Sequence, residues 1–355
     1  MPWRQKVAAL CLAILVFVGV GLVKAQGKEL QADFVEKNII VQLDKPANTA
    51  GANPEENLLE LGSSDFRNLR VKITIKNNGE QEAKNIRLEV PLLAELDSTY
   101  QRILEEKFSH QPVEIKKESV FSRIAVIELA SLLPGKSDVI TVDYKLQVNP
   151  VKANFATVWE QNGFTKQNVG QAYLQPGPKI ESDHPQIVAK AKELTAGLKT
   201  NLEKAKAIYD FVVDYLQYDL NASVRNKGAL AALQSGTGVC EEYAALFTAL
   251  ARAAGIPARQ VNGYADPKGT GESFNIAAGQ ALNLRGYRHS WAEFYLEGMG
   301  WVPVDPTRDI NSKEDRYFGA LPRTSHIAQN YLDQSLKVRY RGGKLSAGWE
   351  ETLVR

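Results

Sequence analysis

The stretch GTGVCEEYAALFTALARAAGIP, residues 236–257, decides how the second half of the chain folds. Its alanine-rich middle predicts a helix over residues 239–254, and Gly255 and Pro257 are typical of residues that end a helix. The glycines at the start let the chain turn sharply into this helix. Cys240 is therefore expected in the first helical turn.

A cysteine in a first turn lies beside unpaired backbone N–H groups and the positive end of the helix dipole, which favour a thiolate over a thiol. The same N–H groups could hold the oxyanion that forms when a thiolate attacks a carbonyl group. The alternative is a buried cysteine that packs like alanine, because cysteine is among the most buried residue types. Position alone leaves both interpretations of Cys240 open.

The N-terminal segment, residues 1–26, has the form of a signal peptide or a membrane anchor. Two positive charges precede an apolar run from Val7 to Val23, which is about as long as the shortest membrane-spanning helices. With a cleaved signal or an uncleaved anchor, we expect the rest of the chain to be exported, either extracellular or anchored and facing outside. Since Cys11 lies in the apolar run, the exported part holds only Cys240, which cannot form an internal disulfide.

The overall composition is that of an ordinary soluble protein. Hydrophobic residues make up 44% of the chain and charged residues 24%, and the formal net charge is +2. This balance argues against a nucleic-acid partner and against a polybasic membrane-binding segment. Contact with a membrane is expected only through residues 1–26, if they are not cleaved.

Residues 28–150 are predicted to form an all-β domain. Apolar and polar residues alternate in several short runs separated by turn signals, which is typical of an antiparallel sandwich of immunoglobulin-like type. His110 lies in a polar stretch and is expected to be a solvated loop residue. The four clearest runs are residues 69–76, 85–92, 122–129 and 139–148.

The composition of the sequence then changes, which indicates a linker followed by a second domain. Residues 151–184 are rich in Asn, Gln, Gly and Pro and indicate a linker or strap. Helical patterns follow from Pro185, including a capping box from Thr200 to Glu203. We expect residues 185–355 to form one domain of helices and strands, which makes the whole chain an α+β protein.

A thiolate nucleophile needs a proton acceptor and a group that orients this acceptor. His289 opens two strand-like runs joined by a glycine-flanked turn, and Asp305 closes the second run. In a hairpin these two residues are neighbours, and they share a face only if the loop has an odd length or a bulge shifts the register. We predict the odd loop or the bulge. The alternatives are a strand-edge histidine without a role and a turn aspartate.

Several other residues have simpler interpretations. His184 and His326 lie in polar segments with turn-forming residues and are expected at the surface. Glu241 and Glu242 suit the helix dipole and are interpreted as solvated caps. The polar, glycine-rich stretch 265–287 fits either a lid over the site or a surface loop. Trp291 and Arg259 with Tyr264 are interpreted as structural.

The segments GTGVCEEYAALFTALARAAGIPARQVNGY and RHSWAEFYLEGMGWVPVDPT together resemble the core of the transglutaminase-like superfamily. The resemblance spans about Pro185 to Thr307 and implies a papain-like fold with a catalytic domain over 185–355. It implies Cys240 as the nucleophile, His289 as the general base and acid, and Asp305 as the residue that orients the imidazole. The long sandwich before the core resembles that of exported bacterial members.

The resemblance implies thiol-dependent acyl transfer or hydrolysis of amide bonds in proteins or peptides at the cell envelope, with a cell-envelope polymer as a further candidate partner. No cofactor is expected, and no metal is proposed because no loop has the oxygen-ligand spacing of an EF-hand. Two alternatives stay open. One is a non-catalytic binding scaffold at the cell surface, and the other is a true protein-crosslinking transglutaminase.

Overall fold

The computed structural model describes residues 58–95, 100–119, 122–156, 171–310, 312, 314–330 and 335–355. The predicted signal or anchor, residues 1–26, lies outside these ranges. Among the described residues, no helix combines the length and the apolar character needed to cross a membrane.

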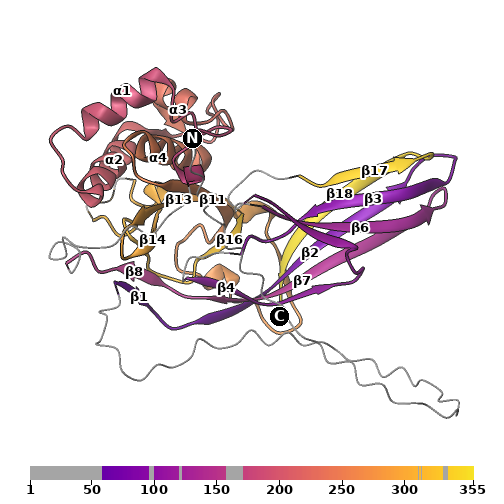
Figure 1. The fold of residues 1–355 in the computed structure, drawn as a ribbon. Helices are drawn as coiled ribbons and strands as arrows, with labels where there is room; N and C mark the ends of the chain where they lie inside the picture. The colour runs from indigo at the N-terminus through magenta and orange to yellow at the C-terminus, as the bar shows by residue number, and fades with distance from the viewer. Residues whose placement is uncertain are drawn as a thin grey trace, which may run out of the picture. The chain divides into compact units, whose positions relative to one another are not determined.

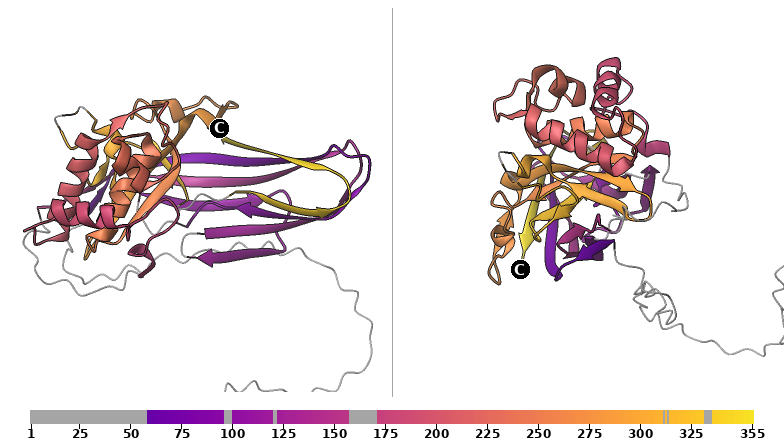
Figure 2. Two further views of the ribbon diagram at one scale, coloured as in Figure 1. Left: turned by 90° about the horizontal axis from the view of Figure 1, so that it is seen from above. Right: turned by 90° about the vertical axis from the view of Figure 1, so that its left-hand side faces the viewer.

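Two sheets pack face to face and form the sandwich (Figures 1 and 2). Their shared core contains Leu69 and Ile73 from one sheet and Leu88 and Ile127 from the other, all at 1% exposure or less. Alternation along each strand sends every second side chain into this core. The first sheet has the order β12(Ala281–Asn283), β18(Leu345–Val354), β2(Asp65–Asn77), β7(Ser137–Val148), β4(Gln101–Phe108), and the second β17(Lys337–Arg341), β3(Ala83–Pro91), β6(Ser122–Leu132), β5(Glu114–Ser119).

The four predicted runs all form strands, namely β2, β3, β6 and β7, and the expected all-β sandwich is confirmed. The last two strands differ from the expectation. We expected residues 337–354 within the catalytic domain, whereas β17 pairs with β3 and β18 pairs with β2 along its whole length. Figure 1 shows these C-terminal strands in yellow beside the early strands in indigo. Both ends of the described chain therefore contribute to one sandwich.

The second half begins with helices whose ends follow the sequence signals. Thr200 accepts a hydrogen bond from Glu203 N at 3.1 Å, and Glu203 Oε2 accepts one from Thr200 N at 2.8 Å, so the predicted capping box is present. His184, expected at the surface, is half-buried and caps the first helix through Nδ1. The helices are α1(Pro185–Leu194), α2(Asn201–Tyr215), α3(Ala229–Ser235) and α4(Cys240–Ala253).

Helix α4 is the centre of this half of the protein. Residues 242–251 are all buried, because α1, α2 and α3 surround the helix on one side and a four-stranded sheet covers the other. A helix with one apolar stripe buries a single face, whereas this central helix buries nearly its whole circumference. The sheet has the order β14(Gly300–Val304), β13(Arg288–Leu296), β11(Ala258–Ala265), β16(His326–Asn330).

Short elements join the two halves. Gln101 of the sandwich donates to Ala328 O at 2.8 Å and accepts from Ala328 N at 2.9 Å, so β4 is fixed to β16. Tyr100 packs with Trp291 in a small core on the sheet face away from the helices. The remaining strands are β1(Leu59–Leu61), β8(Val151–Ala153) and β15(Ala320–Leu321) in one sheet, and β9(Gln217–Tyr218) and β10(Thr237–Gly238) in a parallel pair.

Candidate active site

Cys240 is the first residue of α4, and its side chain is partly exposed rather than sealed in the core. Gly238, two residues before Cys240, is required for steric reasons. A Cβ at Gly238 would lie 2.4 Å from Cβ of Glu242, so only glycine lets the chain pass so close to the helix. The predicted position of the thiol in the first turn is confirmed.

Glu242 corrects an expectation. We interpreted it as a solvated cap, but its side chain is only 1% exposed. Its Oε2 accepts a hydrogen bond from Val239 N at 3.2 Å, so it does cap the helix, from a buried position. The burial follows from the tight turn through Gly238, which lies directly against this side chain.

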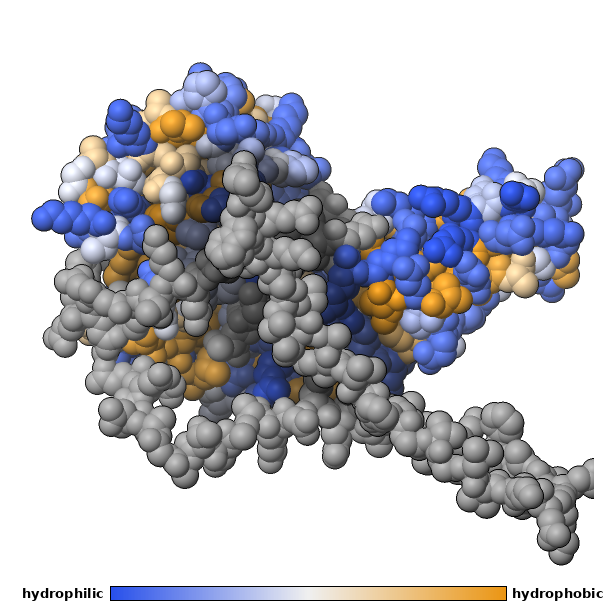
Figure 3. All heavy atoms as spheres, in the orientation of Figure 1, coloured by the Kyte–Doolittle hydropathy of each residue, from blue (hydrophilic) through white to orange (hydrophobic). Residues whose placement is uncertain are grey.

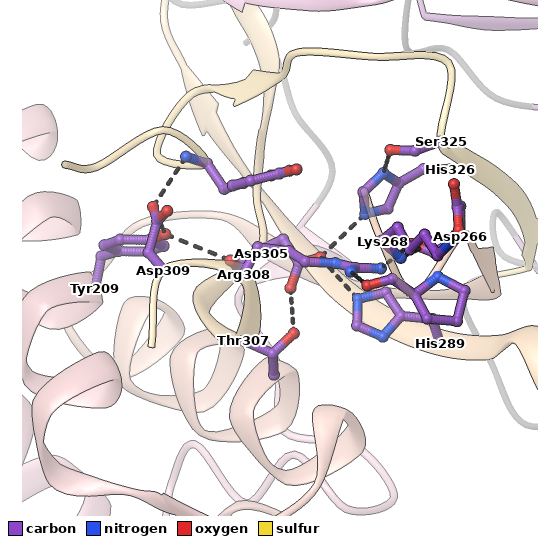
Figure 4. Close-up of polar contacts among 12 residues, drawn as sticks. Tyr209, Asp266, Lys268, His289, Asp305, Thr307, Arg308, Asp309, Ser325 and His326 are labelled. Atoms are coloured by element: carbon purple, nitrogen blue, oxygen red, sulfur yellow. Dashed lines mark hydrogen bonds and ion pairs between the residues drawn. The ribbon is translucent and has the colours of Figure 1, made fainter. Parts of the chain in front are cut away.

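His289 and Asp305 share a face of the hairpin. Leu296 pairs with Gly300, so the loop of residues 297–299 has the predicted odd length. This register brings the two side chains together, with His289 Nε2 at 2.7 Å from Asp305 Oδ2 (Figure 4). Their predicted proximity is confirmed, while their chemical role stays a prediction.

The residues after Asp305 hold its carboxylate in place. Strand β14 ends at Val304, and a 3-10 turn over Pro306–Arg308 follows. Thr307 Oγ1 donates to Asp305 Oδ1 at 2.6 Å, and Arg308 Nε lies 3.4 Å from Oδ2. Asp305 itself is fully buried. Burial opposes its charge, but the paired imidazoles outweigh burial and hold the pKa of Asp305 well below its usual range.

The carboxylate of Asp309 also holds this turn in place. Asp309 accepts hydrogen bonds from the Tyr209 hydroxyl at 2.6 Å and from Tyr317 N at 2.9 Å. Tyr209 belongs to the buried stripe of α2. Helix α2 therefore supports the segment that carries Asp305, and Figure 4 shows Tyr209 beside Asp309.

The imidazole of His289 connects the carboxylate to the thiol. Burial alone would lower the pKa of His289, but the charge and hydrogen bond of Asp305, together with the neighbouring Cys240, raise it to about 9. Cys240 is also among the groups that act on the ring. Since Nε2 faces Asp305, Nδ1 is the nitrogen left for the sulfur. At neutral pH this geometry favours the imidazolium form of His289.

His326 contradicts our expectation of a surface residue, because its side chain is 1% exposed. Its Nε2 lies 3.0 Å from Asp305 Oδ2, so one carboxylate oxygen faces two imidazoles (Figure 4). Strand β16 brings His326 opposite Ala265 of β11. This pairing joins segments about sixty residues apart. The sequence around His326 gives no indication of it.

Tyr218 is a second residue that sequence reasoning missed. It lies in β9, pairs with Gly238 just before the nucleophile, and is 44% exposed. Partial burial raises the pKa of Tyr218, and the nearby Cys240 raises it further. The phenol therefore lies at the open side of the site, close to the sulfur.

The donor atoms of His289, Asp305 and His326 lie within 4.8 Å of one another, close enough to hold a metal ion. The charge of Arg308 opposes this use. Its guanidinium Nε is 3.4 Å from the shared Asp305 oxygen and would repel a cation there.

The stretch 265–287 is fixed to the protein rather than free. Asp266 is fully buried and accepts hydrogen bonds from Gly271 N at 2.8 Å and Ser273 Oγ at 2.8 Å. Phe274 enters the sandwich core, and β12 pairs with β18 at the edge of the sandwich. The stretch therefore ties the sheet of the site to the sandwich.

Comparison with known proteins identifies the domain that carries these residues. The family model of the transglutaminase-like superfamily matches residues 188–306, and the chain therefore carries a transglutaminase-like domain. Over 84% of this chain, the crystal structure of a candidate cysteine protease of Cytophaga hutchinsonii superposes with a TM-score of 0.50 at 17% identity, and all of that chain is covered. This likeness concerns the fold. Families with this fold are cysteine-dependent enzymes.

Relatives also match by sequence over part of their length, among them two bacterial proteins. A segment of 147 residues is 37% identical to an uncharacterized protein of Haemophilus influenzae and covers 38% of this chain and 39% of that protein. A segment of 131 residues is 38% identical to a protein-glutamine gamma-glutamyltransferase of Pseudomonas aeruginosa and covers 33% of this chain and 19% of that enzyme. The matches thus span well under half of either relative.

Proposed function

We propose that this protein transfers acyl groups from amides of proteins or peptides through a thioester on Cys240. The observation that carries the proposal is the connected set of a partly exposed thiol, the imidazole of His289 and the buried carboxylate of Asp305. A buried carboxylate without a function would be costly unless fully paired, and here its pairing is directed at the imidazole that contacts the thiol.

The proposed reaction begins with the thiolate–imidazolium pair. The sulfur attacks the amide carbonyl carbon, and the carbonyl electrons move to the oxygen to give a tetrahedral oxyanion. The C–N bond then breaks while Nδ1–H of His289 donates its proton to the departing nitrogen. A thioester and ammonia or an amine result.

Resolution of the thioester reverses these proton movements. Neutral His289 takes a proton from water or from a primary amine as that nucleophile attacks the thioester carbon. Breaking the C–S bond regenerates the thiolate and releases an acid or a new amide. The charge of Asp305 stabilises the imidazolium that reappears, in line with the raised pKa of His289.

The oxyanion needs donors near Cys240. The N-terminus of α4 supplies backbone N–H groups and the positive end of its dipole. The hydroxyl of Tyr218 is near the sulfur and open to solvent, and we infer that it donates a further hydrogen bond to the oxyanion.

We propose that the protein acts outside the cytoplasm, on the basis of the export signal or anchor in residues 1–26. The sandwich then serves as a support for the catalytic domain. The face drawn in Figure 3 mixes hydrophilic and hydrophobic residues over the described elements, as expected for a protein that works in water.

The test uses a glutamine-containing peptide and a labelled primary amine, with Cys240→Ala as the matched control. Incorporation of label supports transfer to amines, and release of ammonia or cleavage without incorporation supports hydrolysis. Either outcome must vanish in the control. If the wild type and the control behave alike on a panel of protein and peptide substrates, the non-catalytic scaffold replaces this proposal.

A further inference from the structure

His326 is the ionisable group of the site that the proposed reaction does not use. It is buried against Asp305, and the ring of Trp291 packs at its edge with centroids 5.1 Å apart. The same tryptophan stacks on His289 at 6.2 Å. The two imidazoles thus share a carboxylate oxygen and an aromatic wall.

The proton on His326 can be assigned from its partners. An ionised carboxylate only accepts hydrogen bonds, so the Nε2 that faces Asp305 must carry a proton. Ser325 Oγ lies 3.0 Å from Nδ1 and, as a hydroxyl, can donate to it. Ser325 and His326 are both buried, so bulk water does not replace these bonds. The arrangement fits a neutral imidazole protonated at Nε2.

The charges around His326 support the neutral form. The groups that face it are Asp305, His289, Arg308 and the ring of Tyr317. Burial, and to a smaller extent the charges of His289 and Arg308, outweigh the attraction of Asp305 and lower the pKa of His326 to about 4. The ionised Asp305 already faces two positive groups, His289 and Arg308.

We propose that His326 is a positioning residue, which acts as a neutral hydrogen-bond donor to keep the Asp305 carboxylate ionised and directed at His289. This inference rests on the proposed function for its meaning in catalysis. Thr307 fixes the other oxygen of the carboxylate, and His326 fixes the oxygen that His289 needs. Without His326, the carboxylate can turn away, and the imidazolium loses part of its stabilisation.

The matched variants are His326→Gln, which keeps an N–H donor near Nε2, and His326→Leu, which fills the space without a donor. His110→Gln in the sandwich, where His110 is partly exposed, is the control. The readouts on the full-length protein are the pH dependence of iodoacetamide alkylation at Cys240, identified by peptide mass spectrometry, and the rate of the proposed reaction. Neither alkylation nor its pH profile requires a known substrate.

We expect His326→Leu to move the alkylation midpoint to higher pH and to lower kcat by about 100-fold with little change in KM, since misplacement of a reacting group has effects of this size. His326→Gln should stay within a few-fold of wild type, like His110→Gln. Equal behaviour of the Leu and Gln variants, whether both normal or both impaired, would overturn the donor role.

The wild type gives an independent test that does not depend on the folding of any variant. In NMR spectra with isotope-labelled histidine at about pH 7, His326 should be neutral with its proton on Nε2, and His289 should carry both protons. A charged His326, or a proton on Nδ1 of His326, would refute the proposal. Absence of turnover alone would count against the proposed function and leave this test intact.

Discussion

Tyr100 of the sandwich donates its hydroxyl proton to Glu293 Oε1 at 2.5 Å, and Glu293 lies in the strand that begins with Arg288 and His289. The same hydroxyl accepts a hydrogen bond from Trp291 Nε1 at 3.3 Å. Glu293 is also paired with the buried Arg259 at 2.6 Å. A residue of the all-β half thus completes a buried polar network behind the candidate site.

Replacing Tyr100 by Phe should reveal this coupling. The change leaves Trp291 Nε1 and one oxygen of Glu293 without their partner, and unsatisfied buried groups cost about 1–3 kcal/mol each. Urea unfolding should show a loss of about 2–6 kcal/mol for the two groups together, and alkylation of Cys240 should be slower. Tyr287→Phe, at a partly exposed tyrosine, is the control. An unchanged free energy of unfolding would show that the network does not contribute to stability.

Gly263→Ala should displace the strand that carries His326. A Cβ at this position would lie 2.1 Å from Ile327 O, so β16 must move away from β11. We expect a loss of about 1–3 kcal/mol from this overpacking. Thermal unfolding measures the loss, and Gly286→Ala, which meets open space, is the matched change. Equal unfolding temperatures for the two variants would contradict the close approach.

The buried His326 should make the free energy of unfolding depend on pH in the acid range. Its pKa is about 4 in the folded protein and 6.5 in an unfolded chain, so the unfolded chain binds the proton first and stability falls as pH drops from 6.5 to about 4. At about 1.4 kcal/mol per pH unit, the loss is about 3 kcal/mol. His289 is protonated in the folded protein over this whole window and in the unfolded chain below about pH 6, so it changes the slope only near pH 6.5. Asp305 contributes only below its ordinary value of 3.8.

Urea titrations at both ends of that window measure this loss. His326→Gln cannot bind the proton and should lose about 3 kcal/mol less than wild type on acidification. If the two proteins lose stability in parallel, the buried neutral imidazole is refuted.

Tyr218→Phe tests the inferred oxyanion donor. The variant keeps the ring and removes only the hydroxyl, so kcat should fall by about 100- to 1,000-fold, the usual effect of one lost oxyanion donor. KM and the alkylation profile should change little, because alkylation forms no oxyanion. Leu220→Ala, at an exposed neighbour, serves as the control. Equal rates for Tyr218→Phe and wild type would exclude the donor.

The sequence allowed the closest parts of the site to be predicted because their signals are local. The glycine turn and alanine-rich run place Cys240 at a helix start, and strand alternation with loop length places His289 beside Asp305. Each inference depends on periodicity within about twenty residues.

The rest depended on contacts between distant segments. His326 joins the site only because β16 pairs with β11, and its short polar strand has no periodicity of its own. Likewise, residues 345–354 were expected in the second domain, and their pairing with β2 of the sandwich could not be predicted from the sequence. Alternation predicts that a strand forms, whereas its partner is decided by packing.

The most direct test of the central claim is the pH profile of iodoacetamide alkylation at Cys240 in wild type and in His289→Ala. The account predicts reaction in wild type at a pH well below the ordinary thiol range of about 8.5, and a shift of the profile to higher pH when the imidazole is removed. A profile in the ordinary range that is the same in both proteins would contradict it.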